Sequence, residues 1–62
     1  MPMKPREMVA LLESKGFRYI RSNGSHRIYR NDETGKQTTV PFHAKELHKG
    51  TEDAILKQAG LK

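Results

Sequence analysis

The sequence predicts an α+β domain in which a helix, three antiparallel strands and a second helix follow one another, with both helices on one face of the sheet. Three observations lead to this class. Apolar residues recur at helical spacing near each end of the 62-residue chain. Between these segments, apolar and polar residues alternate as in half-buried strands. Turn sequences separate the strands, and no repeat, linker or low-complexity segment divides the chain, so residues 1–62 are expected to form a single domain.

The first element is predicted to be a helix over residues 5–15. Pro5 stands where the first turn of a helix tolerates proline, and Gly16 follows as a left-handed terminator. Phe17, one place beyond that glycine, is expected to fold back on the last helical turn. The apolar positions that recur at helical spacing are Met8, Val9, Leu11 and Leu12.

The second segment is predicted to be a β-hairpin, because Asn23-Gly24 is a favoured pair for a two-residue turn. A turn at these residues places Arg21 opposite His26 and Tyr19 opposite Ile28. His26 would then share a face with Tyr19 and Ile28, at the rim of the core if that face packs on the helices. A bulge or a one-residue slip would exchange the faces, and the sequence leaves both arrangements open.

A third strand is predicted over residues 36–40, because this segment is rich in β-branched residues and is followed by Pro41. Residues 31–35 form the turn that precedes it, which makes the sheet an antiparallel meander. Residues 42–50 have no clear period, although Leu47 is expected to anchor them to the core.

The last element is predicted to be a helix with Thr51 as its N-cap and Gly60 at its end. Glu52 and Asp53 in its first turn would interact favourably with the helix dipole. Its apolar face consists of Ala54, Ile55, Leu56 and Ala59.

Charge and size limit the classes of function. The chain carries a formal net charge of +5 and has a pI near 9.9, so a nucleic acid or an acidic protein is the natural partner. The absence of cysteine and of a long apolar run favours a soluble, cytoplasmic protein that does not enter a membrane. A core of this size is expected to contribute only about 3–5 kcal/mol of net stability, so a stabilising partner would fit.

His26 is the candidate catalytic residue because it follows a tight turn in an arginine-rich segment. An imidazole titrates near pH ~6.5 and can exchange a proton with a ribose hydroxyl or a leaving oxygen. No acidic residue lies between residues 18 and 30, a segment that contains Arg18, Arg21, Arg27 and Arg30. Against this, a lone strand histidine is usually a surface or core residue, and basic hairpins bind nucleic acid more often than they cut it.

The order and spacing of several short motifs resemble those of HicA-type toxins. The matching segments are Gly16-Phe17, Gly24-Ser25-His26, Val40-Pro41-Phe42-His43, Lys49-Gly50-Thr51 and the helix that ends at residues 55–61. This resemblance implies a fold like that of a double-stranded RNA-binding domain. It also implies a toxin-antitoxin module in which the toxin cleaves mRNA and a HicB-type antitoxin masks its site. The family's catalytic histidine falls on His26, and Pro41 and His43 match a second motif.

The expected chemistry is metal-independent cleavage of RNA. His26 would remove the ribose 2′-hydroxyl proton, and a 2′,3′-cyclic phosphate and a free 5′-hydroxyl would result. His43 is interpreted as a loop histidine that contacts RNA or solvent, with a role as the complementary acid as the alternative; His48 receives no role. No metal or cofactor is assigned, because His43, His48 and Glu46 do not complete a tetrahedral site. We therefore assign catalysis to His26 and RNA binding to Gly24, Ser25, Arg21, Arg27 and His43.

Two other functions are also compatible with this sequence. The first is a non-catalytic RNA-binding module, which the same fold and charge would serve. The second is a protein-interaction domain whose basic face binds only an acidic partner, and this alternative predicts no salt-sensitive RNA binding. If the chain is a toxin, we expect it to be a monomer on its own.

Overall fold

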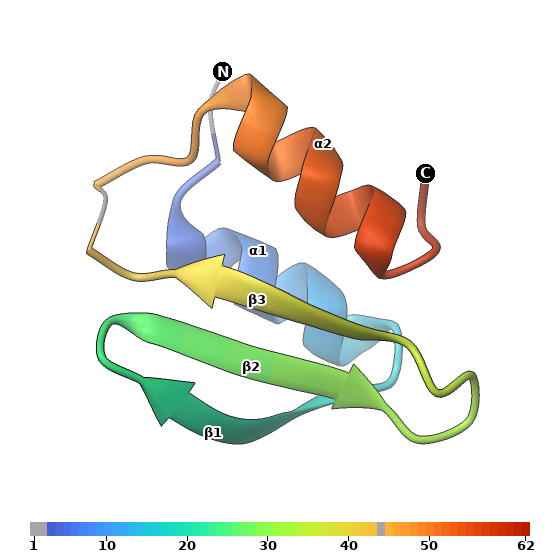
Figure 1. Cartoon of the computed structure of the whole chain (residues 1–62). Helices are drawn as coiled ribbons and strands as arrows, with labels where there is room; N and C mark the ends of the chain where they lie inside the picture. The colour runs from blue at the N-terminus through green and yellow to red at the C-terminus, as the bar shows by residue number, and fades with distance from the viewer. Residues whose placement is uncertain (1–2, 44) are drawn as a thin grey trace.

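A computed structural model describes residues 3–43 and 45–62 of the chain. Its elements are α1 (Pro5–Ser14), β1 (Phe17–Asn23), β2 (His26–Asn31), β3 (Gln37–Pro41) and α2 (Lys49–Gln58), as Figure 1 shows. The predicted αβββα order is therefore confirmed, and the arrangement has the form of a double-stranded RNA-binding domain. Among the described residues, no helix is long and apolar enough to cross a membrane.

The ends of α1 follow from local sequence. The Glu7 carboxylate accepts a hydrogen bond from the backbone N–H of Lys4 at 2.8 Å, which satisfies one of the donors at the helix N-terminus. The helix ends at Ser14, one residue before the predicted end, and Lys15 is its C-cap. Gly16 then adopts a φ of 94°, a conformation that favours glycine, and the chain turns directly into β1.

The three strands form one antiparallel sheet in the order β1-β2-β3, which confirms the predicted meander. The predicted hairpin register is wrong, however. The structure pairs Asn23 with His26 and Arg21 with Ile28, so the two turn residues are Gly24 and Ser25. An Asn23-Gly24 turn needs a positive φ at both residues, and here only Gly24 has one, at 64°. A glycine at the first of two turn residues is instead the signature of a type II′ hairpin.

A β-bulge in β1 compensates for this shift. The register changes between Tyr19 and Arg21, and Ile20 is the additional residue. Tyr19 consequently lies opposite Tyr29, and their rings meet edge to face with centroids 5.9 Å apart. The predicted pairing of Tyr19 with Ile28, and with it the shared face of Tyr19 and His26, is therefore wrong.

Helix α1 and the core lie on one face of the sheet, whereas α2 lies beside the edge strand β3 and not squarely on that face as predicted (Figure 1). Figure 1 shows α1 behind the sheet and α2 alongside β3, the edge strand farthest from β1. Thr38 and Val40 of β3 are buried, and the Thr38 hydroxyl donates a hydrogen bond at 2.9 Å to the side-chain oxygen of Gln58 in α2. The hydrophobic core consists of Met8, Leu12, Phe17, Tyr29, Val40, Leu47, Ile55 and Ala59.

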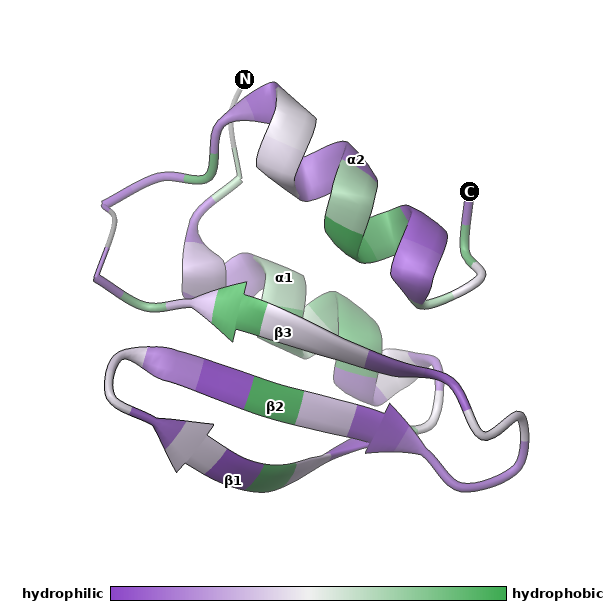
Figure 2. Ribbon diagram, viewed as in Figure 1, coloured by the Kyte–Doolittle hydropathy of each residue, from purple (hydrophilic) through white to green (hydrophobic). Residues whose placement is uncertain are grey.

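This core is thin, as the composition predicts. Figure 2 shows that single hydrophobic residues in the strands are separated by hydrophilic ones. Leu47 is only 1% exposed, so the prediction that it anchors the segment between β3 and α2 is confirmed. Its backbone N–H also donates to the carbonyl oxygen of Met3 at 2.7 Å, which ties that segment to the N-terminal residues.

The second helix begins earlier than predicted. Thr51 is not its N-cap, because α2 starts at Lys49 and His48 occupies the cap position with an extended backbone. Gly50, a poor helix former, therefore lies within the first turn. Leu47, two residues before this start, is buried in the core.

Candidate functional site

His26 is the first residue of the central strand and lies on the open face of the sheet. Its neighbours across the ladder are Asn23 on β1 and Pro41 on β3. The next residue, Arg27, lies opposite Val40, whose side chain is buried under the helices. Since adjacent strand residues point to opposite faces, His26 points away from the core, and the residue is exposed. Its imidazole is thus accessible to a large ligand.

His43 comes close to His26 although it lies 17 positions later, outside the regular sheet. The backbone N–H of Phe42 donates to the carbonyl oxygen of Ser25 at 2.7 Å, which extends the ladder past the end of β3. The rings of His26 and His43 are then in edge-to-face contact, with centroids 5.4 Å apart and planes at 86°. From the sequence, a pairing of these two histidines was only the alternative to a loop role for His43.

Ser25 is a hydrogen-bond partner of the His43 imidazole. Its Oγ lies 3.1 Å from Nδ1 of His43, within hydrogen-bond distance. The hydroxyl can donate to a neutral Nδ1 or accept from a protonated one. The turn that precedes His26 therefore orients His43 as well, so that both imidazoles depend on the same two-residue turn.

The two imidazoles border a cavity of about 480 Å³ between the end of β3 and the start of α2. The residues that line it are His26, Pro41, His43, Glu46, Leu47, His48 and Thr51. A neighbouring hollow of about 440 Å³ continues along α2, and His26, Pro41 and Thr51 line both. Together they form an open groove beside the histidine pair.

The N-terminus of α2 opens onto this groove. His48 is the cap residue, and Gly50 and Thr51 lie in the first turn, where backbone N–H groups have no partner within the helix. Such groups and the helix dipole favour a negative charge. The groove therefore combines two imidazoles with the N-terminus of a helix, which attracts anions.

Sequence analysis missed His48, Glu46 and the first turn of α2 as parts of the site. The loop that contains His48 and Glu46 has no period that would indicate where it folds, so nothing in the sequence placed them near His26. Within residues 3–43 and 45–62, no group of three or more His, Asp or Glu side chains could hold a metal ion.

The arginines of the hairpin separate into two groups. Nε of Arg18 lies 2.7 Å from a carboxylate oxygen of Asp32, and Nε of Arg30 lies 3.7 Å from the other oxygen. The hydrogen bond from Arg18 lowers the pKa of the Asp32 carboxyl below its ordinary value, so the acid is ionised at neutral pH. Arg21 and Arg27 have no ion pair among the described residues.

The two remaining arginines lie on opposite faces of the sheet. Arg21 is opposite Ile28 and not directly opposite His26, which corrects the predicted register. It still lies on the open face, diagonally across from His26. Arg27 lies on the other face, as strand alternation predicts, and its guanidinium carbon is 4.1 Å from the ring centroid of Phe42. Gly24 and Ser25 form the turn between β1 and β2.

The fold and the groove define a small basic αβββα domain, similar in architecture to double-stranded RNA-binding domains, with paired imidazoles on an accessible surface. Comparison with known proteins gives the family. A family model of the HicA toxin of bacterial toxin-antitoxin systems matches residues 5–61. The chain is also 38% identical over 61 residues to a protein of Pseudomonas fluorescens (strain Pf0-1) described as a probable mRNA interferase HicA, with 97% of this chain and 98% of the relative covered. The chain therefore belongs to the HicA toxin family.

Proposed function

We propose that this toxin cleaves mRNA without a metal ion and that His26 is the general base. The observation that carries the proposal is the contact between the exposed rings of His26 and His43 at one groove. The relative from Pseudomonas fluorescens is described as a probable mRNA interferase, and that description supports the choice of substrate. The net charge of +5 also favours a polyanion.

The reaction is an internal transesterification of the RNA. Neutral His26 accepts the proton of a ribose 2′-hydroxyl, and the 2′-oxygen attacks the adjacent phosphorus. The bond between phosphorus and the 5′-oxygen breaks, and protonated His43 gives its proton to that oxygen. The products are a 2′,3′-cyclic phosphate and a free 5′-hydroxyl, and the two histidines exchange protonation states.

Ser25 fits this scheme as a positioning residue. A protonated imidazole donates from both ring nitrogens, so Ser25 Oγ accepts from Nδ1 of His43. The other nitrogen, Nε2, is then the one that donates to the leaving oxygen. A fixed orientation of this kind lowers the entropic cost of proton transfer.

Negative charge that develops on the phosphate oxygens has two sources of stabilisation. The first turn of α2 provides backbone N–H groups at Gly50 and Thr51, on the wall of the groove. Arg21 provides a guanidinium on the same face of the sheet as His26. Arg27 lies on the other face, so we assign it to the binding of flanking RNA and not to the scissile phosphate.

Neutralisation is proposed to occur by coverage of the groove with a HicB-type antitoxin. An acidic partner surface would match the basic chain, and burial of additional apolar area would stabilise the thin core. The complex should melt at a higher temperature than the toxin alone and should not cut RNA. A complex that still cuts RNA at the same rate would show that coverage of the groove is not the mechanism.

The decisive experiment uses purified toxin, end-labelled single-stranded RNA and EDTA. We expect cleavage with cyclic phosphate ends, and loss of about 10²–10⁴-fold in rate for His26→Ala, a typical range for general acid-base catalysis. Lys57→Ala, an exposed substitution on α2, is the matched control. Circular dichroism checks the fold of each variant. Full cleavage by folded His26→Ala would show that another residue is the general base. Unchanged toxicity of folded His26→Ala, with no cleavage by the unmodified toxin, would favour the alternative of a non-catalytic RNA-binding module.

A further inference from the structure

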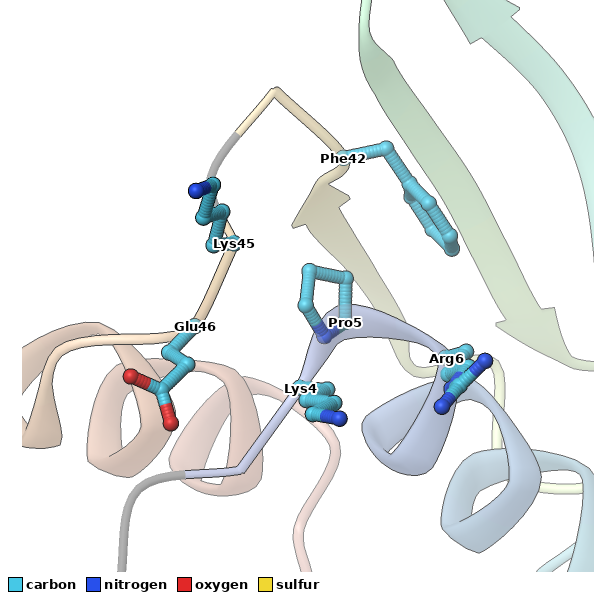
Figure 3. Close-up of a pocket in the computed structure, with 6 residues that line it drawn as sticks. All are labelled: Lys4, Pro5, Arg6, Phe42, Lys45 and Glu46. Carbon is cyan, nitrogen blue, oxygen red and sulfur yellow. The ribbon is translucent and has the colours of Figure 1, made fainter.

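A separate cavity, lined mainly by basic side chains, lies close to the histidine pair and has no part in the chemistry proposed above. Its volume is about 540 Å³, and it lies between the start of α1 and the segment that follows β3. Figure 3 shows the rings of Pro5 and Phe42 among charged side chains from both segments. The residues that line it are Lys4, Pro5, Arg6, Phe42, Lys45 and Glu46.

This cavity is joined to the catalytic groove through neighbouring residues. Phe42 lines the cavity, whereas His43, the next residue, lines the groove. Arg27 stacks on the Phe42 ring at 4.1 Å, whereas His26, the residue before it, faces the groove. Glu46 borders both spaces. A ligand that extends past the histidine pair around the end of β3 would therefore reach this cavity next.

The chemistry of the lining fits a nucleotide. Phe42 is half-buried and lines the cavity, and the Arg27 guanidinium lies over one face of its ring, so a planar group would stack on the other face. The apolar rings of Pro5 and Phe42 share the lining with three exposed cationic side chains, those of Lys4, Arg6 and Lys45. Among the described residues that line the cavity, Glu46 is the only acid. Aromatic rings stack on unpaired bases, and surrounding Lys and Arg side chains bind the phosphates.

We propose that this cavity is a nucleobase subsite, in which Phe42 stacks on a base adjacent to the phosphodiester cleaved at His26. The inference rests on the proposed function and specifies its substrate as single-stranded RNA, because only an unpaired base can enter the cavity and stack. The excess of cations distinguishes this occupant from an apolar peptide segment. The contact provides affinity and fixes the register of the strand, while proton transfer stays with the histidines.

The test measures binding separately from cleavage. We would use His26→Ala as the parent protein, so that the probe stays intact, and follow the fluorescence anisotropy of a labelled six-nucleotide single-stranded RNA. A set of the same RNAs, each with one abasic position, locates the stacked base. We expect one abasic position to weaken binding to the parent by about tenfold, as expected from the loss of one stacked base.

Phe42→Leu in this parent should weaken binding of the intact RNA to a similar extent and should make the critical abasic position neutral. Phe42→Tyr keeps an aromatic ring and should bind like the parent, which also controls for folding. Tyr19→Leu, a change at an exposed aromatic residue of β1, is the matched control and should leave the abasic profile unchanged.

Two results would overturn the subsite. One is an abasic penalty of equal size in the parent and in folded Phe42→Leu. The other is unchanged RNA binding together with lost antitoxin binding in Phe42→Leu, which would assign the cavity to the protein partner. Neither result contradicts the proposed function. That proposal is wrong if the unmodified toxin does not cut RNA or if cleavage does not require His26.

Discussion

Ser25 Oγ and His43 Nδ1 lie 3.1 Å apart although the two residues are separated by 18 positions in the sequence. This relationship links the hairpin turn to the segment after β3, and it accompanies the contact between His43 and His26. The turn that precedes the proposed base thus also orients the proposed acid. The position of His43 consequently depends on a hydroxyl that has no chemical step of its own.

The first prediction concerns this hydroxyl. Ser25→Ala should lower kcat for RNA cleavage by about tenfold, because a lost hydrogen bond of about 1.4 kcal/mol no longer orients His43. KM should change little, since the contact acts on the reacting geometry and not on substrate binding. Ser25→Thr retains the hydroxyl and should restore most of kcat. A rise in KM at constant kcat would instead assign Ser25 to RNA binding.

The second prediction separates the two histidines by the leaving group. A uridine 3′-phosphate ester of 4-nitrophenol loses a stable phenolate, so its cleavage needs a base but no acid. His43→Gln should therefore cleave this ester at close to the normal rate, while His26→Gln should lose about 10²–10⁴-fold. On RNA, both variants should be slow. An equal loss for both variants on the activated ester would contradict the role of His43 as the acid.

Local sequence patterns were sufficient to predict the order of the elements. The apolar spacing before Gly16 defines α1, and the alternation around Tyr29 and Val40 defines strands, because one face of each element is buried. The end of α1 was predicted within one residue, since Gly16 takes the left-handed conformation that terminates a helix.

The details of the site depend on interactions that no local pattern contains. The hairpin register follows from which of two adjacent residues takes a positive φ, and the bulge at Ile20 then restores the burial of Phe17. The approach of His43 to His26 depends on the hydrogen bonds of Phe42 and His43 to Ser25, a residue 17 or more positions earlier in the chain. Similarly, the absence of acidic residues from residues 18–30 gave no sign that Asp32 would pair with Arg18.

The third prediction compares Gly24, which has a positive φ in the hairpin turn, with Gly50, which lies in α2. Gly24 has a φ of 64°, and a Cβ there would meet no atom within 4 Å, so the cost of an alanine is conformational and not steric. Gly24→Ala should lower the free energy of unfolding by about 1–2 kcal/mol, and it should slow cleavage by distorting the turn before His26.

Gly50→Ala is the matched comparison, because Gly50 lies within α2 and also has open space around it. This change should raise the free energy of unfolding by about 0.5–1 kcal/mol, since alanine favours the helix. Urea denaturation of both variants measures the difference. Equal stability of the two variants would show that the conformation at Gly24 is not the constraint on the hairpin.

The fourth prediction concerns the carboxylate that pairs with two arginines. Asp32→Asn removes the partner of Arg18 and Arg30, so both guanidinium groups become available to phosphate. Binding of single-stranded RNA should tighten, and its dependence on salt should become steeper by about 0.7 in log–log slope for each additional phosphate that the protein neutralises. Glu33→Gln is the matched control, because it makes the same change in charge at an exposed neighbour with no ion pair among the described residues. An equal effect of the two substitutions would mean that net charge alone acts.

The same ion pair has a defined pH dependence. The hydrogen bond from Arg18 lowers the pKa of Asp32 below the ordinary value of 3.8, so its contribution to stability is complete above that value. The contribution is lost as the pH falls through the lowered pKa, where the carboxyl becomes protonated. The difference in unfolding midpoint between Asp32→Asn and the unmodified toxin should therefore be constant from about pH 5 to pH 8 and should disappear in stronger acid. A difference that changes across neutral pH would show that another titrating group is coupled to this pair.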